Sequence, residues 1–473
     1  MGQEIGSEIF TADDFARFGQ ALELETQHAR DAFSHGQFAN EGLVAGFELE
    51  AWLLDEHFFP VPRNVVFLEQ LGNPLVVEEL SRFNIEINGT AQPLCGSALS
   101  RLENELVSTW QQCMEVAHDQ GATLVAIGTL PTVRERDLSL ASMSPRKRYA
   151  ALNRQILKLR CGRPVTLEIA GIDRLSTTHD DIMLEAGTTS FQVHLQMPAG
   201  DAVRTYNAAQ ILAAPLVAVA ANSPFLFEHA LWHETRIPLF EQAVDCCDPA
   251  RLEQRRVIFG RDYLDADPMS YFDENVSLYP VLLPYDTCEP VERYAHLCMH
   301  NGTIWRWNRM LIGFDKSGVP HLRVEQRILP AGPSIIDMVA NAALYYGLVT
   351  VLAGQSVAPE SLLPFTDARE NFYTCARYGL EAQMVWLDGR RLHVADLLLH
   401  ELLPLAGEGL NKLGLDAADI KRYLGVIEGR LHSGQNGAVW QLAHHAKYRD
   451  FQRLTADYLE LQRQLAPVHE WPI

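Results

Sequence analysis

The sequence predicts an α+β fold built around a largely antiparallel sheet. Short segments that alternate polar and apolar residues, as half-buried strands do, lie between longer segments with helical periodicity. The spacing from one predicted strand to the next is unequal, so the regular strand–helix–strand rhythm of a parallel sheet is missing. No Pro/Gly/Ser-rich linker and no internal repeat interrupts the 473 residues. We therefore expect a single domain over residues 1–473, with a mainly helical C-terminal part from about residue 395.

The predicted helices follow from the spacing of apolar residues along the chain. A periodicity of 3.6 residues indicates helices over residues 12–33, 97–120, 333–354 and parts of 395–465. Ser100 and Glu103 have the spacing of a capping box, and Pro333 stands where proline favours the first helical turn. The most apolar run, residues 211–221, is too short to cross a bilayer and is typical of a buried helix.

Four of the predicted strands share an unusual polar face. The clearest predicted strands cover residues 43–53, 83–88, 124–128, 190–197 and 322–329. Side chains at alternate positions of a strand point to the same face of the sheet. On four of these strands that face carries Glu48 and Glu50; Asn84, Glu86 and Asn88; Gln192, His194 and Gln196; and Arg323, Glu325 and Arg327. Each strand alone is more typical of a sheet with one solvated face, but the four faces together contain no Lys and no Thr.

Convergence of the four faces would place four carboxylates, those of Glu48, Glu50, Glu86 and Glu325, in one site. At an effective dielectric constant near 20, two carboxylates about 5 Å apart repel each other by roughly 3 kcal/mol. Such a cluster is stable only when cations neutralise it or when some carboxyl groups stay protonated. Oxygen ligands with one imidazole, that of His194, suit Mg²⁺ or Mn²⁺ better than Zn²⁺. A glutamate-rich face with interleaved arginines is typical of phosphoryl transfer.

Charge and motifs exclude several classes of protein. Lys and Arg number 39 against 60 Asp and Glu, a net charge of −21 that repels nucleic acids and anionic membrane surfaces. The chain contains no Walker A loop and no GxGxxG, GxSxG or HExxH motif. Its eight cysteines have no framework spacing, and the N-terminus lacks the basic and apolar segments of a secretory signal. We therefore expect a cytoplasmic protein with reduced thiols and with no nucleic-acid or membrane partner.

The polar-faced strands resemble the glutamate–cysteine ligase family, in the form often called type 2 carboxylate–amine ligases. The matching segments are residues 46–50, 83–88, 190–195, 221–224 and 323–338, within a resemblance that runs from about residue 40 to about residue 440. The resemblance implies a glutamine-synthetase-like fold, in which the antiparallel sheet forms the floor of a funnel-shaped active site surrounded by helices. It also implies a reaction in which ATP converts the side-chain carboxylate of glutamate to γ-glutamyl phosphate. An amine then displaces phosphate and leaves a γ-glutamyl amide.

The resemblance further implies roles for individual residues, with ATP and Mg²⁺ (or Mn²⁺) as cofactors. The metal-binding residues are Glu48, Glu50, Glu86, Glu325 and His194. The resemblance also implies that His194 and Arg327 face the phosphates of ATP. Apart from the resemblance, we predict that Gln192 contributes to ATP binding and that Arg236, which could hold the α-carboxylate of glutamate, and Asn88 bind the substrate. Glu325 and Arg327 form the catalytic pair, and Arg327 faces the transferred phosphoryl group. Residue types alone leave simpler roles open, namely a structural histidine at position 194, a salt bridge from Arg327 to a glutamate, and a surface helix position for Arg236.

The sequence thus predicts an ATP- and Mg²⁺-dependent ligase that joins L-glutamate to an amine, first of all to L-cysteine as in glutathione biosynthesis. Two alternatives stay open: the same chemistry with another amine acceptor, and a non-catalytic nucleotide- or metal-binding protein on this scaffold. A metal-dependent hydrolase would also use clustered carboxylates, but it would not need Arg327 beside them. The basic run Arg146-Lys147-Arg148 predicts either a solvated loop or a group that steers ATP. The substrates are small molecules, and no feature of the sequence indicates an oligomeric state.

Overall fold

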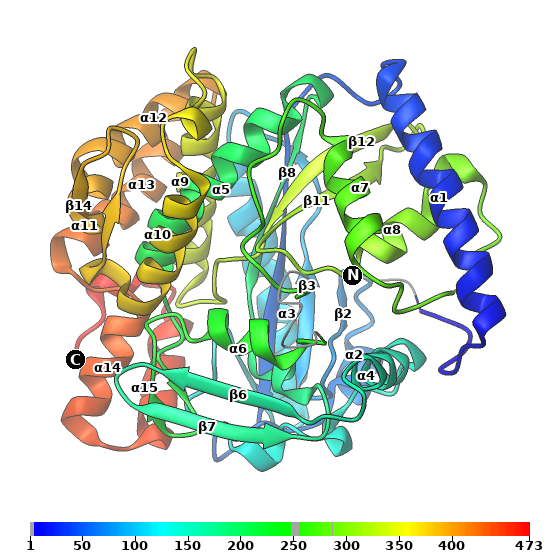
Figure 1. The fold of residues 1–473 in the computed structure, drawn as a ribbon. Coiled ribbons are helices and arrows are strands. Elements are labelled where there is room, and N and C mark those ends of the chain that lie inside the picture. The colour runs from blue at the N-terminus through cyan, green and yellow to red at the C-terminus, as the bar shows by residue number, and fades with distance from the viewer. Residues whose placement is uncertain (1–3, 247–254, 286) are drawn as a thin grey trace.

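The predicted antiparallel sheet forms the centre of the molecule (Figure 1). In this computed structural model, residues 4–246, 255–285 and 287–473 are described. Across these residues the sheet has eight strands in the order β11-β12-β8-β1-β3-β2, with β4 and β5 also paired to β1, and every pair is antiparallel. The strands are β1 (Val44–Leu54), β2 (Val76–Glu78), β3 (Asn84–Asn88), β4 (Gln92–Pro93), β5 (Thr123–Val125), β8 (Phe191–Met197), β11 (Asn308–Phe314) and β12 (Pro320–Gln326). The five predicted strands are confirmed, with bounds shifted by a few residues.

Helices surround the sheet, and small hairpins lie outside it. The helices are α1 (Ala12–Ser34), α2 (Asn64–Leu71), α3 (Ala98–Asp119), α4 (Lys147–Leu159), α5 (Ala202–Ala220), α6 (Arg236–Ala243), α7 (Met269–Leu278), α8 (Ala295–Asn301), α9 (Ile335–Ala353), α10 (Phe365–Tyr378), α11 (Val394–Leu397), α12 (Leu403–Lys412), α13 (Ala417–Ser433), α14 (Gly437–Tyr448) and α15 (Phe451–Arg463). The hairpins are β6 (Val165–Ala170) with β7 (Arg174–His179), β9 (Phe225–Leu226) with β10 (His229–Ala230), and β13 (Gln383–Val385) with β14 (Arg391–His393). From α11 onward the chain is helical, as its apolar periodicity predicts.

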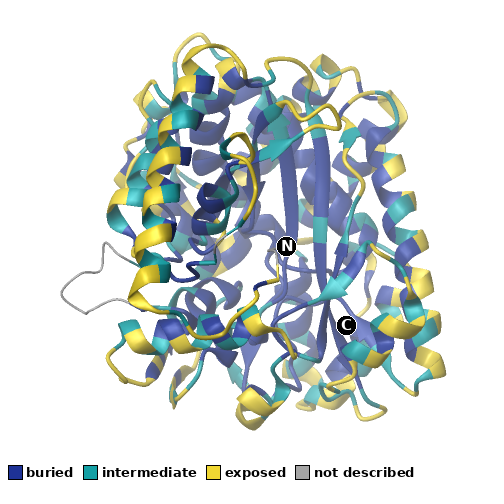
Figure 2. Ribbon diagram, turned by 90° about the vertical axis from the view of Figure 1, so that its right-hand side faces the viewer, coloured by how far each residue is buried: buried dark blue, intermediate teal, exposed yellow. Residues whose placement is uncertain are grey.

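The apolar face of the sheet is covered by two buried helices. α5 packs against β11 and β12, and α9 packs against β8. Nearly all residues of both helices are buried, and Figure 2 shows the central strands in dark blue within a shell of partly exposed helices. The hydroxyl of Tyr346 in α9 donates to the main-chain oxygens of Gly46 (3.3 Å) and His194 (3.1 Å), which are cross-strand partners in β1 and β8. α9 thereby holds the two central strands from the face opposite their polar side chains.

α9 also crosses α12 at very short distance. A Cβ atom added to Gly409 of α12 would lie 1.9 Å from the main-chain oxygen of Gly347 in α9. A Cβ atom added to Gly347 would lie 2.3 Å from the main-chain oxygen of Ala406. Only glycine fits at these two positions. Among the described helices, α9 is the one that is long and apolar enough to cross a membrane, and 89% of its apolar window is buried inside the protein.

The predicted capping box of α3 is wrong. Ser97, and not Ser100, is the N-cap of this helix. Ser100 lies in the first turn, where its amide and hydroxyl donate to the carboxylate of Asp419 in α13. Glu103 accepts the hydroxyl hydrogen of Tyr423 instead of an amide of its own helix. Contacts with a segment more than 300 residues away therefore occupy both groups of the predicted box.

The helix predicted over residues 333–354 is confirmed as α9, with its first residue shifted by two positions. Ser334 is the N-cap, and it forms a capping box with Asp337. Pro333 precedes the N-cap and does not occupy the first helical position. Since the capping box satisfies the first amides of the helix, no proline is needed there.

Candidate active site

The register of the sheet brings the four polar faces together. Residues directly opposite each other in antiparallel strands point to the same face. The cross-strand pairs are Glu50 with Glu86, Glu48 with Asn88, Glu48 with Gln192, and His194 with Glu325. The predicted convergence of the polar faces is therefore confirmed.

This polar surface forms the floor of a cavity of about 570 Å³. The sheet contributes the charged residues Glu48, Arg309, Arg323 and Glu325 and the apolar residues Leu311, Ile312 and Phe314 to its lining, and Arg327 lines it directly after the end of β12. The remaining walls come from α4, from the 3₁₀ turn that follows β7, from α6 and α7, and from α8. Apolar side chains are concentrated in those walls, so charged groups at the floor are partly shielded from bulk water.

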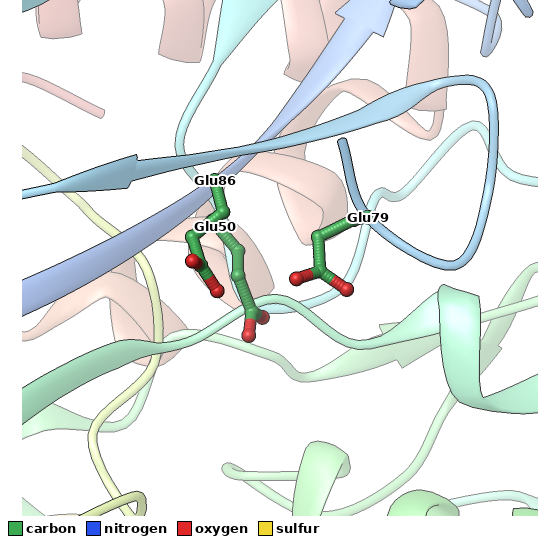
Figure 3. A group of neighbouring side chains, drawn as sticks. All are labelled: Glu50, Glu79 and Glu86. Carbon is green, nitrogen blue, oxygen red and sulfur yellow. The ribbon is translucent and has the colours of Figure 1, made fainter. Parts of the chain in front are cut away.

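Three glutamates form a compact cluster, as Figure 3 shows, and one of them, Glu79, also lines the cavity. Glu50 lies on β1, Glu86 on β3, and Glu79 directly after the end of β2. All three are buried, and one carboxylate oxygen from each lies within 4.8 Å of the others. Glu50 also accepts the amide of Ser190 at 2.7 Å, and Glu79 accepts the amide of Leu80 at 3.1 Å, so both carboxylates are held in place.

The charges in this cluster are poorly compensated by the protein itself. Burial, reinforced by the charges of Glu48 and Glu50, raises the pKa of Glu86 to about 7. Burial, followed by the charges of Glu86 and Glu50, raises the pKa of Glu79 well above its usual range. Burial also raises the pKa of Glu50, although the nearby Arg327 opposes that shift. The cluster therefore favours either protons or a bound cation.

The donor set of this cluster fits a divalent cation. Mg²⁺ and Ca²⁺ take oxygen ligands at about 2.0–2.6 Å, so ligand oxygens around one ion lie within about 5 Å of each other. The carboxylate oxygens of Glu50, Glu79 and Glu86 meet that spacing. Three buried carboxylates without imidazole or thiolate favour Mg²⁺ or Mn²⁺ over Zn²⁺.

A second group of charges lies beside this cluster and is compensated within the protein. Nε2 of His194 lies 3.3 Å from Oε1 of Glu48. Burial raises the pKa of Glu48, but the charge and hydrogen bond of His194 outweigh burial and lower that pKa to about 2. Glu325 accepts two hydrogen bonds from Nη2 of Arg309, at 3.0 and 2.8 Å, and one from Nη1 of Arg327. Despite burial, the two arginines lower the pKa of Glu325.

Arg327 is held by two side chains of the polar face, those of Glu325 and Gln192. Its Nη1 donates to Glu325 and, at 2.6 Å, to Oε1 of Gln192. The amide of Gln192 in turn donates to Glu50 at 3.0 Å, which links Arg327 to the three-glutamate cluster. Burial opposes the charge on Arg327, but Glu325 and Glu50 raise its pKa. Its buried Nε–H has no hydrogen-bond partner among the described residues and belongs to a side chain in the cavity wall. Arg327 thus forms the salt bridge that its residue type left open, and it keeps one N–H that no described residue accepts.

The predicted substrate-binding role of Arg236 finds no support in the geometry. Arg236 is buried and does not line the cavity among the described residues. Its Nε donates to Glu234 at 3.0 Å, and its two Nη atoms donate to the main-chain oxygens of Arg327 and Ile328. Arg236 therefore positions the end of β12 behind Arg327, and it does not lie on the surface of a helix.

Asn88 and the basic run also have specific places. Asn88 donates to Glu86 at 3.0 Å and lies next to the cluster without lining the described cavity. Its predicted contact with a substrate stays a prediction. Arg146 is the N-cap of α4 and pairs with Glu78, whereas Arg148 lies in the helix and lines the cavity. The predicted solvated loop is wrong, and one arginine of the run faces the site.

Three site residues were not found from the sequence. Glu79 follows a strand of three residues, which is too short to show an alternation of polar and apolar residues. Only its position shortly before the strand of Glu86 could have indicated that it belongs to the site. Arg309 lies on β11, opposite Glu325, in a strand whose polar face carries no other charge. Glu185 lies in a 3₁₀ turn, for which periodicity gives no signal.

Replacing Glu86 with Gln should stabilise the metal-free protein at alkaline pH. A carboxyl whose folded-state pKa is raised contributes stability below its unfolded-state pKa of about 4.5, and that stability is lost as the pH rises through about 7. Gln keeps the shape and cannot ionise. In urea unfolding at pH 8 with a chelator, we expect Glu86→Gln to raise the free energy of unfolding by about 1 kcal/mol or more. At pH 5 we expect little difference between the mutant and the wild type. Glu168→Gln, at an exposed position of β6, is the matched control. A mutant that is less stable at pH 8 would contradict the unfavourable charge at Glu86.

A match to a known protein family shows to which family the chain belongs. Residues 44–457 match the family model described as glutamate-cysteine ligase family 2. The chain belongs to this family. None of the curated proteins matches the chain. As a member of glutamate-cysteine ligase family 2, the chain is a carboxylate–amine ligase, as the resemblance of its polar-faced strands predicts.

Solved structures confirm the glutamine-synthetase-like fold. The chain is similar to the glutamate–cysteine ligase (gshA) of Francisella tularensis, solved in complex with AMP, with a TM-score of 0.57 and 11% identity. That similarity covers 92% of this chain and 91% of the other. A bifunctional glutathione synthetase from Pasteurella multocida gives a TM-score of 0.51 and 12% identity, over 93% of this chain and 55% of the longer one. The curved antiparallel sheet with helices around it is common to these ligases.

Proposed function

We propose that this family member uses ATP to join the side-chain carboxylate of L-glutamate to an amine through γ-glutamyl phosphate, with L-cysteine as the first acceptor to test. The observation that carries the proposal is the position of Arg327. Its guanidinium is buried in the cavity wall and is tied through Gln192 to the three-glutamate cluster, and one of its N–H groups has no partner among the residues that the structure describes. A phosphoryl-transfer site needs this combination of a cation site and a rigid guanidinium.

The charge of the cavity wall supports a polyanionic substrate. Five arginines and five glutamates line the cavity, in a chain whose net charge is −21. Arg293 and Arg323 have no ion pair with any carboxylate among the described residues. Both lie near the apolar side chains of Leu311 and Phe314, and Arg293 stacks on Phe314 with its guanidinium carbon 4.2 Å from the ring centre. Unpaired guanidinium groups beside an apolar wall suit the phosphates and base of a nucleotide.

The residues of the site then have distinct roles in the proposed reaction. Glu50, Glu79 and Glu86 would hold a divalent cation, which neutralises phosphate charge when bound. Arg327 would donate its free N–H to an oxygen of the transferred phosphoryl group. Arg309 keeps Glu325 ionised and in place, so that Arg327 is oriented from one side by Glu325 and from the other by Gln192. The predicted metal-binding roles of Glu48, Glu325 and His194 stay predictions, as does the cytoplasmic location.

The proposal predicts ADP release that depends on two substrates. We expect ADP formation to require L-glutamate and Mg²⁺ and to be fastest with one amine of a panel that includes L-cysteine. If another amine is best, the acceptor is different and the ligase reaction stands. If neither glutamate nor any amine stimulates ADP release, the proposed reaction is wrong, and nucleotide binding without turnover becomes the better reading.

A further inference from the structure

One carboxylate in the cavity wall has no side-chain partner in the described part of the chain. Glu185 lies in the 3₁₀ turn Met183–Gly187, between β7 and β8, and its side chain lines the cavity. No hydrogen bond or ion pair joins that side chain to any described residue. The charges that act on it belong to Glu50, Arg327 and Arg148, so it lies close to the group that would face the phosphoryl transfer.

The other carboxylates of the cavity wall are already engaged. Glu48 pairs with His194, Glu325 pairs with Arg309 and Arg327, and Glu79 belongs to the three-glutamate cluster. Glu289 also lines the cavity but is exposed. Glu185 is therefore the carboxylate that can accept a cationic group of a substrate without breaking an existing contact.

The second half of the proposed reaction needs such a group. An amine enters the cavity from water at neutral pH mainly as an ammonium ion, which has no lone pair and cannot attack a carbonyl carbon. A carboxylate near the acyl phosphate can attract the ammonium group and remove its proton. The apolar side chains of Leu152, Ile182 and Val244, which share this part of the lining, would exclude water from the attack.

We propose that Glu185 binds the ammonium group of the attacking amine and accepts its first proton, an inference that rests on the ligase reaction proposed above. The lone pair released on nitrogen attacks the carbonyl carbon of γ-glutamyl phosphate. The new C–N bond forms, and the bond between the carbonyl carbon and the oxygen that carries phosphorus breaks. Phosphate leaves with the electron pair of that bond. The second proton on nitrogen leaves with the phosphate as HPO₄²⁻, so the products are the amide, hydrogen phosphate and a protonated Glu185.

The environment of Glu185 suits proton exchange with an amine. Burial, followed by the charge of Glu50, raises the pKa of this carboxyl to about 8, against the opposing charges of Arg327 and Arg148. Without substrate this carboxyl is therefore largely protonated at pH 7. The positive charge of a bound ammonium group lowers its pKa, so the carboxyl releases its proton to water as the amine binds and is then ready to accept one from the ammonium group.

Two nucleophiles that differ in charge test the assignment. Hydroxylamine is uncharged at neutral pH, so it needs neither an anionic binding group nor deprotonation before it attacks. With the preferred amine, we expect Glu185→Gln to lower kcat/KM by at least about 100-fold. With hydroxylamine, we expect γ-glutamyl hydroxamate formation to stay within about threefold of wild type. KM for ATP and KM for glutamate should change little, and Glu185→Asp should recover part of the activity with the amine.

Matched measurements separate this inference from the ligase reaction itself. Glu168→Gln removes an exposed carboxylate of β6, outside the cavity, and should leave both reactions at the wild-type level. Equal losses with both nucleophiles, or a rise in KM for glutamate instead of the effect on the amine, would overturn the role of Glu185. A wild-type enzyme that makes neither amide nor hydroxamate would refute the ligase reaction, whatever the mutant does. If thermal melts show that Glu185→Gln is less stable than wild type, the ratio of its rate with the amine to its rate with hydroxylamine still decides, because a smaller folded fraction lowers both rates equally.

Discussion

Arg327→Lys is expected to lower kcat by at least about 100-fold, with a much smaller change in KM for glutamate. Lysine keeps the positive charge and so still pairs with Glu325. It lacks the planar fork through which Arg327 can bind Glu325 and Gln192 with one nitrogen while another N–H stays free for a phosphoryl oxygen. An interaction made mainly in the transition state affects kcat more than substrate binding.

Steady-state kinetics at saturating ATP test this expectation. Arg174→Lys, at an exposed position of β7, is the control for a conservative change of the same kind. Turnover at the wild-type level in Arg327→Lys would show that this arginine is only a structural partner of Glu325.

Glu325→Gln is expected to destabilise the metal-free protein by about 3–5 kcal/mol, the usual cost of breaking a buried ion pair. Glu325 is 1% exposed, and its carboxylate is the ion-pair partner of both Arg309 and Arg327. A neutral amide would leave two buried guanidinium groups without an anion. Since the folded-state pKa of Glu325 is lowered, its contribution is present above the unfolded-state pKa and is lost as the pH falls.

Urea unfolding at pH 7 with a chelator measures the effect, and Glu86→Gln provides the matched comparison. Both changes remove one buried carboxylate from the same polar face. The expected changes in the free energy of unfolding nevertheless have opposite signs, because Glu86 faces other glutamates and Glu325 faces arginines. Equal effects of the two substitutions would mean that the two groups of charges are not separate.

The polar face of the sheet could be predicted because it depends on local alternation alone. Glu48, Glu86, His194 and Glu325 lie on the same face wherever their strands pair in register, and the apolar opposite face excludes a shift of the register by one residue. The charge balance could not be predicted in the same way. Four converging glutamates suggest general repulsion, whereas Arg309 from a separate strand neutralises one of them.

Other parts of the site depend on contacts between distant segments. Glu79 completes the cluster from a turn, and Arg236 lies behind β12 instead of in the cavity, because the path of the chain between strands decides where each side chain points. The helix cap at Ser100 failed for a similar reason, since Asp419 of α13 takes its hydrogen bonds. Periodicity along one segment contains no information about which other segment will pack on it.

The glycine crossing of α9 and α12 couples remote packing to the geometry of the site. Gly347 follows Tyr346, the residue whose hydroxyl holds β1 and β8 at Gly46 and His194. A methyl group at Gly347 or Gly409 would force the helices apart, and the tether to the two strands would have to stretch or rotate with α9. The spacing between Glu48 and His194 is thus set partly by the thickness of a helix contact on the far side of the sheet. Random mutagenesis for altered turnover should therefore yield variants in α12, although no residue of α12 touches the cavity in the described part of the chain.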